Sequence, residues 1–242
     1  MNYKALNNLA TMFFDSAEHF PQKPFLWAKR NGKYISGSYS ETKNKVQLLA
    51  DSLHQLGVEK GDRVVVVSEN RPEWVIADLA IISLGGITVP AYTTNTADDH
   101  LYILDHSEAK IAIVSGDKLA VRFMNAMSKS ASCKTIISIE ALSSDVDPSL
   151  KYLDWSSLLA PRDKLSMDVL KEAVNLKRDD IACFIYTSGT GGNPKGVMLT
   201  HGSILANCSS AYDLLTEFGL GDEIFLSLLP LSHSYEHTCG LY

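Results

Sequence analysis

The spacing of apolar and polar positions changes several times along the first half of the chain, and each change predicts an element. The stretch Tyr39–Leu56 has the apolar spacing of an amphipathic helix, with Ser40 expected as its N-cap. Four consecutive valines within Arg63–Ser68 are typical of a strand covered on both faces, as in the centre of a parallel sheet. Pro72–Leu84 is expected to be a helix, because proline fits the first turn, where its missing N–H has no partner.

In the residues that follow, expected strands continue to alternate with expected helices. Further strands are expected at Ile87–Ala91, Lys110–Ser115 and Lys134–Ile139, with helices near Asp98–His106 and Lys118–Ser128. Strands that alternate with helices in this way predict an α/β fold with a mostly parallel, doubly wound sheet.

The segment Leu142–Asp180 interrupts the alternation with serine, aspartate and proline in weakly periodic surroundings, which favours a connection over a new core. We therefore divide the chain into three parts. Residues 1–142 form a first α/β subdomain, residues 143–174 connect, and residues 175–242 begin a second α/β subdomain.

A loop rich in glycines and hydroxyls follows the apolar run Ile181–Ile185, which is expected to be a strand. Residues Tyr186–His201 read Y-T-S-G-T-G-G-N-P-K-G-V-M-L-T-H, and Thr200 is expected to begin a helix that runs to about Glu217. Glycines let backbone N–H groups approach phosphate oxygens, hydroxyls donate hydrogen bonds or bind a metal ion, and lysine supplies positive charge. The pattern predicts a polyphosphate-binding loop formed by Thr187, Ser188, Gly189, Thr190, Gly191, Gly192 and Lys195.

Two common phosphate-binding patterns do not fit this loop. A Walker loop has glycine before its lysine and a hydroxyl after it, whereas Pro194 precedes Lys195 and Gly196 follows it. The dinucleotide fingerprint needs a third glycine at the position of Pro194.

Each polar residue of the loop has an expected role. Lys195 would neutralise the β- and γ-phosphates, and Thr187 and Ser188 would contact phosphate or Mg²⁺, while Thr190 and the glycine amides would cradle the phosphates. Lys195 and Thr187 are therefore the candidate catalytic residues, and Thr187 is the candidate metal ligand. Because ATP arrives as a magnesium complex, a carboxylate ligand for the metal is also expected.

The loop resembles the signature loop of the adenylate-forming (AMP-binding) enzymes, which include acyl-CoA synthetases, luciferases and the adenylation domains of peptide synthetases. The usual form of that loop is [YF]-T-S-G-T-T-G-x-P-K-G-V. The chain departs from it once, with Gly191 in place of the second threonine, so one hydroxyl is lost and backbone freedom is gained.

A second segment carries the same resemblance. Leu228–His237 reads L-L-P-L-S-H-S-Y-E-H and is similar to the L-P-L-A-H-x-F-E-R element of the long-chain fatty acyl-CoA synthetases. The resemblance implies that His233 borders the nucleotide and acyl sites and that His237 gates an acyl tunnel. The candidate substrate residues are His233, Tyr235, Glu236 and His237.

The resemblance also implies a reaction. The intact enzyme would join a carboxylic acid, here a long-chain fatty acid, to the α-phosphate of ATP, release pyrophosphate, and pass the acyl group to coenzyme A. The family's Y-G-x-T-E element, ribose-binding aspartate, hinge and C-terminal lysine domain are not found in these 242 residues. We interpret the chain as the truncated N-terminal part of the family's large domain, with two α/β subdomains, and expect little adenylation by this part alone.

Two other functions remain open from the residues. The first is a non-catalytic homologue that binds a nucleotide or an acyl group. The second is a zinc metallopeptidase, because His233, Glu236 and His237 spell H-x-x-E-H, although no motif places a third metal ligand.

Composition and charge limit the kinds of partner and the cellular location that we expect for this protein. A net charge of −6 argues against a nucleic-acid partner, because the negative phosphate backbone of nucleic acids favours binding to a basic protein surface. The four cysteines lack C-x-x-C spacing, which favours reduced thiols. The apolar stretch Val75–Ala91 contains Asp78, Gly85 and Pro90, so we expect no transmembrane segment. A cytoplasmic location is therefore expected, with peripheral membrane contact left open.

Overall fold

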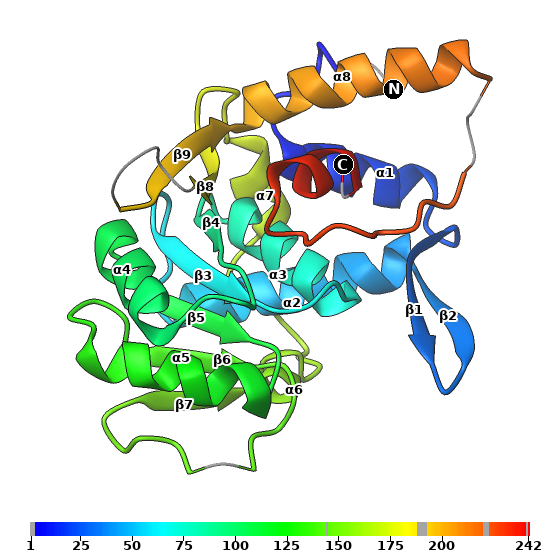
Figure 1. The fold of residues 1–242 in the computed structure, drawn as a ribbon. Coiled ribbons are helices and arrows are strands. Elements are labelled where there is room, and N and C mark those ends of the chain that lie inside the picture. The colour runs from blue at the N-terminus through cyan, green and yellow to red at the C-terminus, as the bar shows by residue number, and fades with distance from the viewer. Residues whose placement is uncertain (1–2, 144, 188–192, 220–222, 241) are drawn as a thin grey trace.

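The computed structural model describes residues 3–143, 145–187, 193–219, 223–240 and 242 (Figure 1). Its main feature is a sheet of seven strands in the order β7-β6-β5-β3-β4-β8-β9. All neighbouring strands are parallel except β8 and β9, which pair antiparallel. The strands are β3 (Arg63–Val67), β4 (Ile87–Pro90), β5 (Ile111–Val114), β6 (Thr135–Ser138), β7 (Lys151–Asp154), β8 (Ile181–Thr187) and β9 (Lys195–Thr200).

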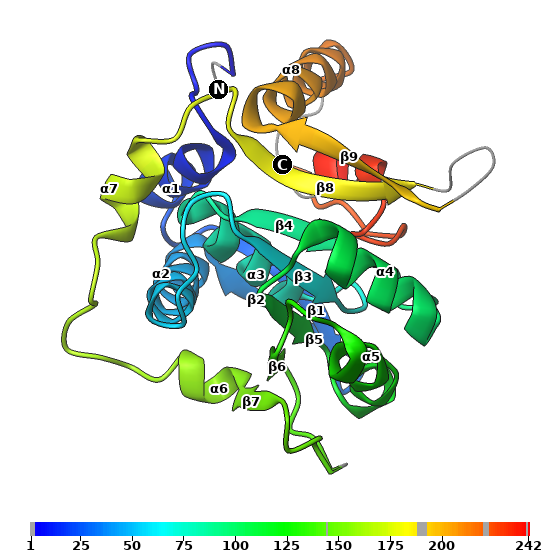
Figure 2. The same cartoon turned by 90° about the vertical axis from the view of Figure 1, so that its left-hand side faces the viewer.

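Helices cover both faces of this sheet, as Figure 2 shows. Val64 and Val66 of β3 pack with one group of helices, and Val65 and Val67 pack with the other. All four valines are fully buried, which confirms a central strand covered on both sides. The first group comprises α1 (Leu9–His19), α2 (Tyr39–Gln55) and α3 (Pro72–Ser83), and the second comprises α4 (Ala97–Ser107) and α5 (Asp117–Lys129).

The remaining elements lie around this core. Strands β1 and β2 form an antiparallel hairpin beside α2 and α3. The hairpin and the short or late helices are β1 (Pro24–Arg30), β2 (Lys33–Ser38), α6 (Trp155–Leu158), α7 (Val169–Val174), α8 (His201–Glu217) and the π-helix η1 (Glu236–Gly240).

The N-cap of α2 differs from the expectation. Ser38, and not Ser40, caps the helix: its hydroxyl accepts from the N–H of Glu41 at 3.2 Å, and the Glu41 carboxylate accepts from the N–H of Ser38 at 2.8 Å. This reciprocal pair satisfies two N–H groups at once, which a cap at Ser40 would leave unpaired. Pro72 opens α3 as expected.

The α/β class and the mostly parallel sheet are confirmed, but the strands after the connection do not begin a separate sheet. Thr88 of β4 pairs in parallel with Cys183 of β8, so β8 and β9 extend the sheet already formed. Cys183 is fully buried, and an apolar strand of this kind is stabilised by packing against an existing sheet. The boundaries at residues 142 and 174 remain a prediction.

The segment expected to be a connection also contributes an edge strand. Strand β7 pairs in parallel with β6, from Lys151 beside Thr135 to Asp154 beside Ser138. Farther along, the buried carboxylate of Asp51 on α2 accepts from the N–H of Ser166 at 2.6 Å and pairs with Arg162 at 2.5 Å. Polar contacts with α2 therefore hold residues 162–166 in place, although this segment has little apolar periodicity.

Candidate functional site

The two described residues of the predicted phosphate loop, Thr187 and Lys195, lie at one end of the β8–β9 strand pair. Thr187 ends β8 and Lys195 begins β9, and the two residues are register partners in the antiparallel pair. Both are exposed. Strand β8 runs parallel to β4, so Thr187 lies at the carboxyl edge of the parallel strands, where open α/β sheets bind ligands.

The predicted loop residues between these two partners lie outside the described part of the chain. They are Ser188, Gly189, Thr190, Gly191 and Gly192. The hairpin nevertheless fixes the two ends of the loop, because Thr187 and Lys195 face each other across one rung of the strand pair.

The element that carries Lys195 differs from the expectation. The loop was expected between a strand and a helix, whereas Lys195–Thr200 forms β9 and the helix starts only at His201. Thr200 is the N-cap as expected, since its hydroxyl accepts from the N–H of Ser203 at 3.1 Å. Antiparallel pairing with β8 satisfies the backbone groups of Lys195–Thr200, and this long-range effect overrides the local pattern.

An aromatic cluster on α4 anchors both strands of the hairpin. The Tyr186 phenol lies 2.8 Å from Nδ1 of His106, and the Tyr102 hydroxyl donates to the carbonyl of Pro194 at 2.9 Å. The rings of Tyr102 and His106 stack with centroids 5.2 Å apart. Gly196 allows close approach to Tyr186, because a Cβ there would lie 3.3 Å from the ring and would push it by a few tenths of an ångström. The base of the loop is thus held to α4 from both sides.

The second candidate segment divides between surface and core. His233 and Tyr235 are exposed, and Nδ1 of His233 accepts from the N–H of Tyr235 at 3.2 Å. Glu236 and His237 are buried, and the Glu236 carboxylate accepts from the N–H of Leu229 at 3.4 Å. The four predicted substrate residues therefore do not share one surface.

His237 forms a buried ion pair. Its Nε2 lies 3.3 Å from Oδ2 of Asp78 on α3, and both side chains are 1% exposed or less. The Tyr242 hydroxyl donates to the same carboxylate oxygen at 2.5 Å, and the Trp74 ring meets the imidazole edge-on at a centroid distance of 5.5 Å. The sequence showed Asp78 only as an interruption of an apolar stretch. Its contacts with His237 and Tyr242 were not predicted.

This pair is charged in the folded protein. Burial lowers the pKa of His237, but the Asp78 carboxylate outweighs burial and raises that pKa to about 10. Burial raises the pKa of Asp78, but the positive charge of His237 outweighs burial and lowers it. The expectation that His237 gates an acyl tunnel remains a prediction.

The zinc alternative gains no support from this geometry. His233 faces solvent while His237 is buried against Asp78, so the two imidazoles do not converge. Among the described residues there is no group of three or more His, Cys, Asp or Glu side chains that could hold a metal ion.

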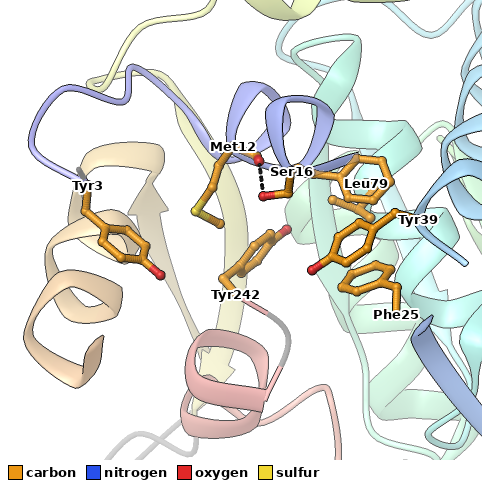
Figure 3. Close-up of a pocket in the computed structure, with 8 residues that line it drawn as sticks. Tyr3, Met12, Ser16, Phe25, Tyr39, Leu79 and Tyr242 are labelled. Atoms are coloured by element: carbon orange, nitrogen blue, oxygen red, sulfur yellow. Dashed lines mark hydrogen bonds between the residues drawn. The ribbon is translucent and has the colours of Figure 1, made fainter. Parts of the chain in front are cut away.

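A small cavity lies beside Tyr242, apart from the hairpin. It has a volume of about 140 Å³, and Figure 3 shows its mostly aromatic and apolar lining. Its lining includes no charged side chain, so it offers no counter-charge to a phosphate or carboxylate. The lining residues are Tyr3, Met12, Phe13, Ser16, Phe25, Tyr39, Leu79 and Tyr242.

His201, the last residue of the loop motif, packs inside the protein. It is fully buried, and its Nδ1 accepts from the N–H of Leu9 at 3.3 Å. Arg178 donates to the Leu6 carbonyl at 2.6 Å in the same region. The start of α8 is thus tied to the start of α1, and His201 packs between the two helices.

Acid is expected to weaken the fold through His201. Burial lowers its pKa from 6.5 to about 4, so the folded state keeps it neutral while the unfolded state takes up a proton. Its contribution to the free energy of unfolding is therefore full above pH 6.5 and falls as the pH drops toward 4.

Urea unfolding at several pH values measures this change in the free energy of unfolding. His201→Asn keeps an acceptor near Leu9 but cannot titrate, so it should reduce the pH dependence; the part that remains is expected from His100, whose pKa is also lowered to about 4 by burial. A wild-type slope in that variant contradicts the assignment.

Comparison with known proteins decides the family. The sequence pattern of the AMP-binding enzymes matches residues 13–242, which is nearly the whole chain. The chain belongs to the AMP-binding enzyme family. Curated members that it resembles include acyl-CoA ligases. It is 30% identical over 240 residues to long chain acyl-CoA synthetase 4 of Arabidopsis thaliana, and 32% identical over 214 residues to fatty acyl-CoA synthetase A of Dictyostelium discoideum.

The chain spans about a third of the length of these AMP-binding enzymes. The two alignments cover 94% and 86% of the chain, but only 35% and 31% of the respective relatives. The inhibitor-bound N-terminal domain of FACL13 from Mycobacterium tuberculosis superposes with a TM-score of 0.71 at 25% identity, covering 98% of the chain and 54% of that structure. The match therefore falls on the N-terminal part of such enzymes.

The described helices differ from helices that span a membrane. Across the described ranges, no helix has both the length and the apolar content needed to cross a bilayer.

Proposed function

We propose that the chain is the ATP-phosphate-binding N-terminal part of an acyl-CoA ligase that activates long-chain fatty acids. The acid would first form an acyl-adenylate with release of pyrophosphate, and coenzyme A would then accept the acyl group. The observation that carries this proposal is the hairpin that places Thr187 and Lys195 opposite each other at the carboxyl edge of the sheet. Similarity to long-chain acyl-CoA synthetases supports the substrate class.

The charge of Lys195 suits a polyphosphate. The side chain is exposed at the hairpin tip, and none of the ion pairs among the described residues involves it. An ammonium that is not engaged by a protein carboxylate is available to neutralise phosphate oxygens. Lys195 and Thr187 are therefore the residues we propose to contact the phosphates.

Magnesium would need further ligands. Mg²⁺ prefers six oxygen ligands, commonly one or two carboxylates together with phosphates and water. The described hairpin offers the Thr187 hydroxyl, and no carboxylate cluster accompanies it in the described part of the chain. The residues described do not by themselves form a magnesium site, so no step of the proposal depends on the metal.

The exposed part of the second segment suits the substrates better than its buried part. His233 and Tyr235 face outward and are proposed to border the nucleotide and the fatty acid. Glu236 and His237 are engaged inside the protein, so we propose that they support the segment from within. The reaction is proposed to take place in the cytoplasm, with ATP and coenzyme A as co-substrates.

Pyrophosphate release by the full-length gene product tests the proposal. With ATP and palmitate, we expect pyrophosphate and an acyl-adenylate, and then palmitoyl-CoA once coenzyme A is added; acids of graded length define the acyl preference. Residues 1–242 alone should release little pyrophosphate, because catalysis at phosphorus depends on many positioned groups. Nucleotide binding without pyrophosphate release in the full-length protein would favour the non-catalytic homologue.

A further inference from the structure

Asn70, just ahead of helix α3, and two residues within the helix present a stripe of side chains to the segment Leu228–His237. Trp74 and Asp78 are four residues apart within α3, and residues with this spacing lie on one face of a helix. Asn70 lies two residues ahead of the first turn, and the other two lie within α3. All three contact the segment or the π-helix that ends it, and no sequence motif assigned them a role.

Asn70 binds the start of this segment at two points, and it also binds Ser227, the residue just before the segment. Its Oδ1 accepts from the N–H of Leu231 at 2.9 Å, and its Nδ2 donates to the carbonyl of Leu229 at 2.6 Å and to the Ser227 hydroxyl at 2.8 Å. One amide side chain thus engages backbone groups on both sides of Pro230. The contact fixes the bend that leads into His233.

Trp74 and Asp78 bind the other end of the segment through His237. Asp78 pairs with the imidazole at 3.3 Å, and the Trp74 ring packs edge-on against it. Nδ1 of His237 lies 3.9 Å from Sγ of Cys183, on β8. His237 therefore lies between α3 and the strand that ends at Thr187, so it links the segment to the phosphate hairpin.

We propose that Asn70, Trp74 and Asp78 are positioning residues that hold the Leu228–His237 segment at a fixed place relative to the phosphate hairpin. His233 and Tyr235 then face the substrates, while the stripe itself does not touch them. This inference rests on the proposed function, because it assigns a purpose to the exposed part of the segment.

Asn70 separates positioning from general stability. It is only half-buried, and Ser227, Leu228 and Leu229 are exposed. Its loss therefore leaves the core intact but frees the segment. Trp74 and Asp78 are fully buried, so substitutions there also affect folding. The decisive variants are consequently made at Asn70.

The experiment compares Asn70→Ala with Asn70→Asp and with the control Asn125→Ala, which removes an exposed amide on α5. In the full-length protein, kcat/KM for palmitate-dependent pyrophosphate release should fall by about 10- to 100-fold in Asn70→Ala, because small misplacements near a reacting centre are costly. Tm should stay near the wild-type value. Asn70→Asp keeps the acceptor for Leu231 and should lose less activity, and the control should lose none.

Hydrogen exchange gives a readout that does not need activity. The amide of Leu231 should exchange at least 10-fold faster in Asn70→Ala than in wild type, while amides of β3 keep their protection. Unchanged protection of Leu231 overturns the inference, as does wild-type kcat/KM in Asn70→Ala. A fall in activity matched by global unfolding indicates a merely structural role and also overturns it. Absent pyrophosphate release in wild type overturns the proposed function, while the exchange result still decides whether Asn70 holds the segment.

Discussion

Replacing Lys195 with alanine is expected to reduce the rate of acyl-adenylate formation by about 10²- to 10³-fold in the full-length protein. The lysine is exposed at the hairpin tip opposite Thr187, where it can neutralise charge that develops on the phosphates. Removing one preorganised donor from a site of this kind typically has an effect of that size. Pyrophosphate release at saturating ATP and palmitate measures the loss.

Two further variants make this result interpretable. Lys195→Arg keeps the positive charge but changes its shape and reach, so activity should fall between that of wild type and that of Lys195→Ala. Lys171→Ala removes an exposed lysine from α7 and should leave the rate unchanged. A Lys195→Ala variant with wild-type activity would remove the hairpin from the proposed mechanism.

Replacing Asp78 with alanine is expected to lower the free energy of unfolding by about 3–5 kcal/mol, because it breaks a buried ion pair and the imidazole must either give up its proton or stay charged in the core without a partner. Asp78 and His237 are 1% exposed or less, so water cannot solvate the orphaned group. The hydroxyl of Tyr242 would lose its acceptor as well. Urea unfolding at pH 7 measures the change. Replacing both members with apolar residues, as in Asp78→Leu with His237→Phe, should recover much of the loss.

The pH dependence of this effect has a defined sign. The pKa of His237 is raised to about 10, so the pair's contribution is full below the ordinary histidine pKa of 6.5 and is lost as the pH rises toward 10. The pKa of Asp78 is lowered, so the contribution is also lost as the pH falls below 3.8 through the folded value. The difference between wild type and Asp78→Ala should therefore shrink at high pH. A difference below about 1 kcal/mol at pH 7 would contradict a buried charged pair.

Local patterns predicted the central part of the fold well. The valine run of β3 and the proline that opens α3 act through their immediate neighbours, so the sequence alone determines them. The N-cap of α2 was wrong by two residues, although Ser38 and Glu41 have the spacing of a capping box that would have located it.

The features that escaped prediction depend on partners far along the chain. Strand β9 is stabilised by pairing with β8, and nothing within Lys195–Thr200 distinguishes a strand from a loop. The sequence showed Asp78 only as an interruption of an apolar stretch, because its partners His237 and Tyr242 lie far away along the chain. The loop motif selected Thr187 and Lys195 without predicting that they pair across two strands, and their roles toward phosphate remain a prediction.

A crystal structure of the protein with bound ATP and magnesium tests the central claim most directly. We expect the β- or γ-phosphate oxygens about 3 Å from Nζ of Lys195 and from the hydroxyl of Thr187, at the tip of the β8–β9 hairpin. Phosphates bound elsewhere on the protein, with Lys195 left in solvent, would contradict the assignment of this hairpin as the phosphate-binding site.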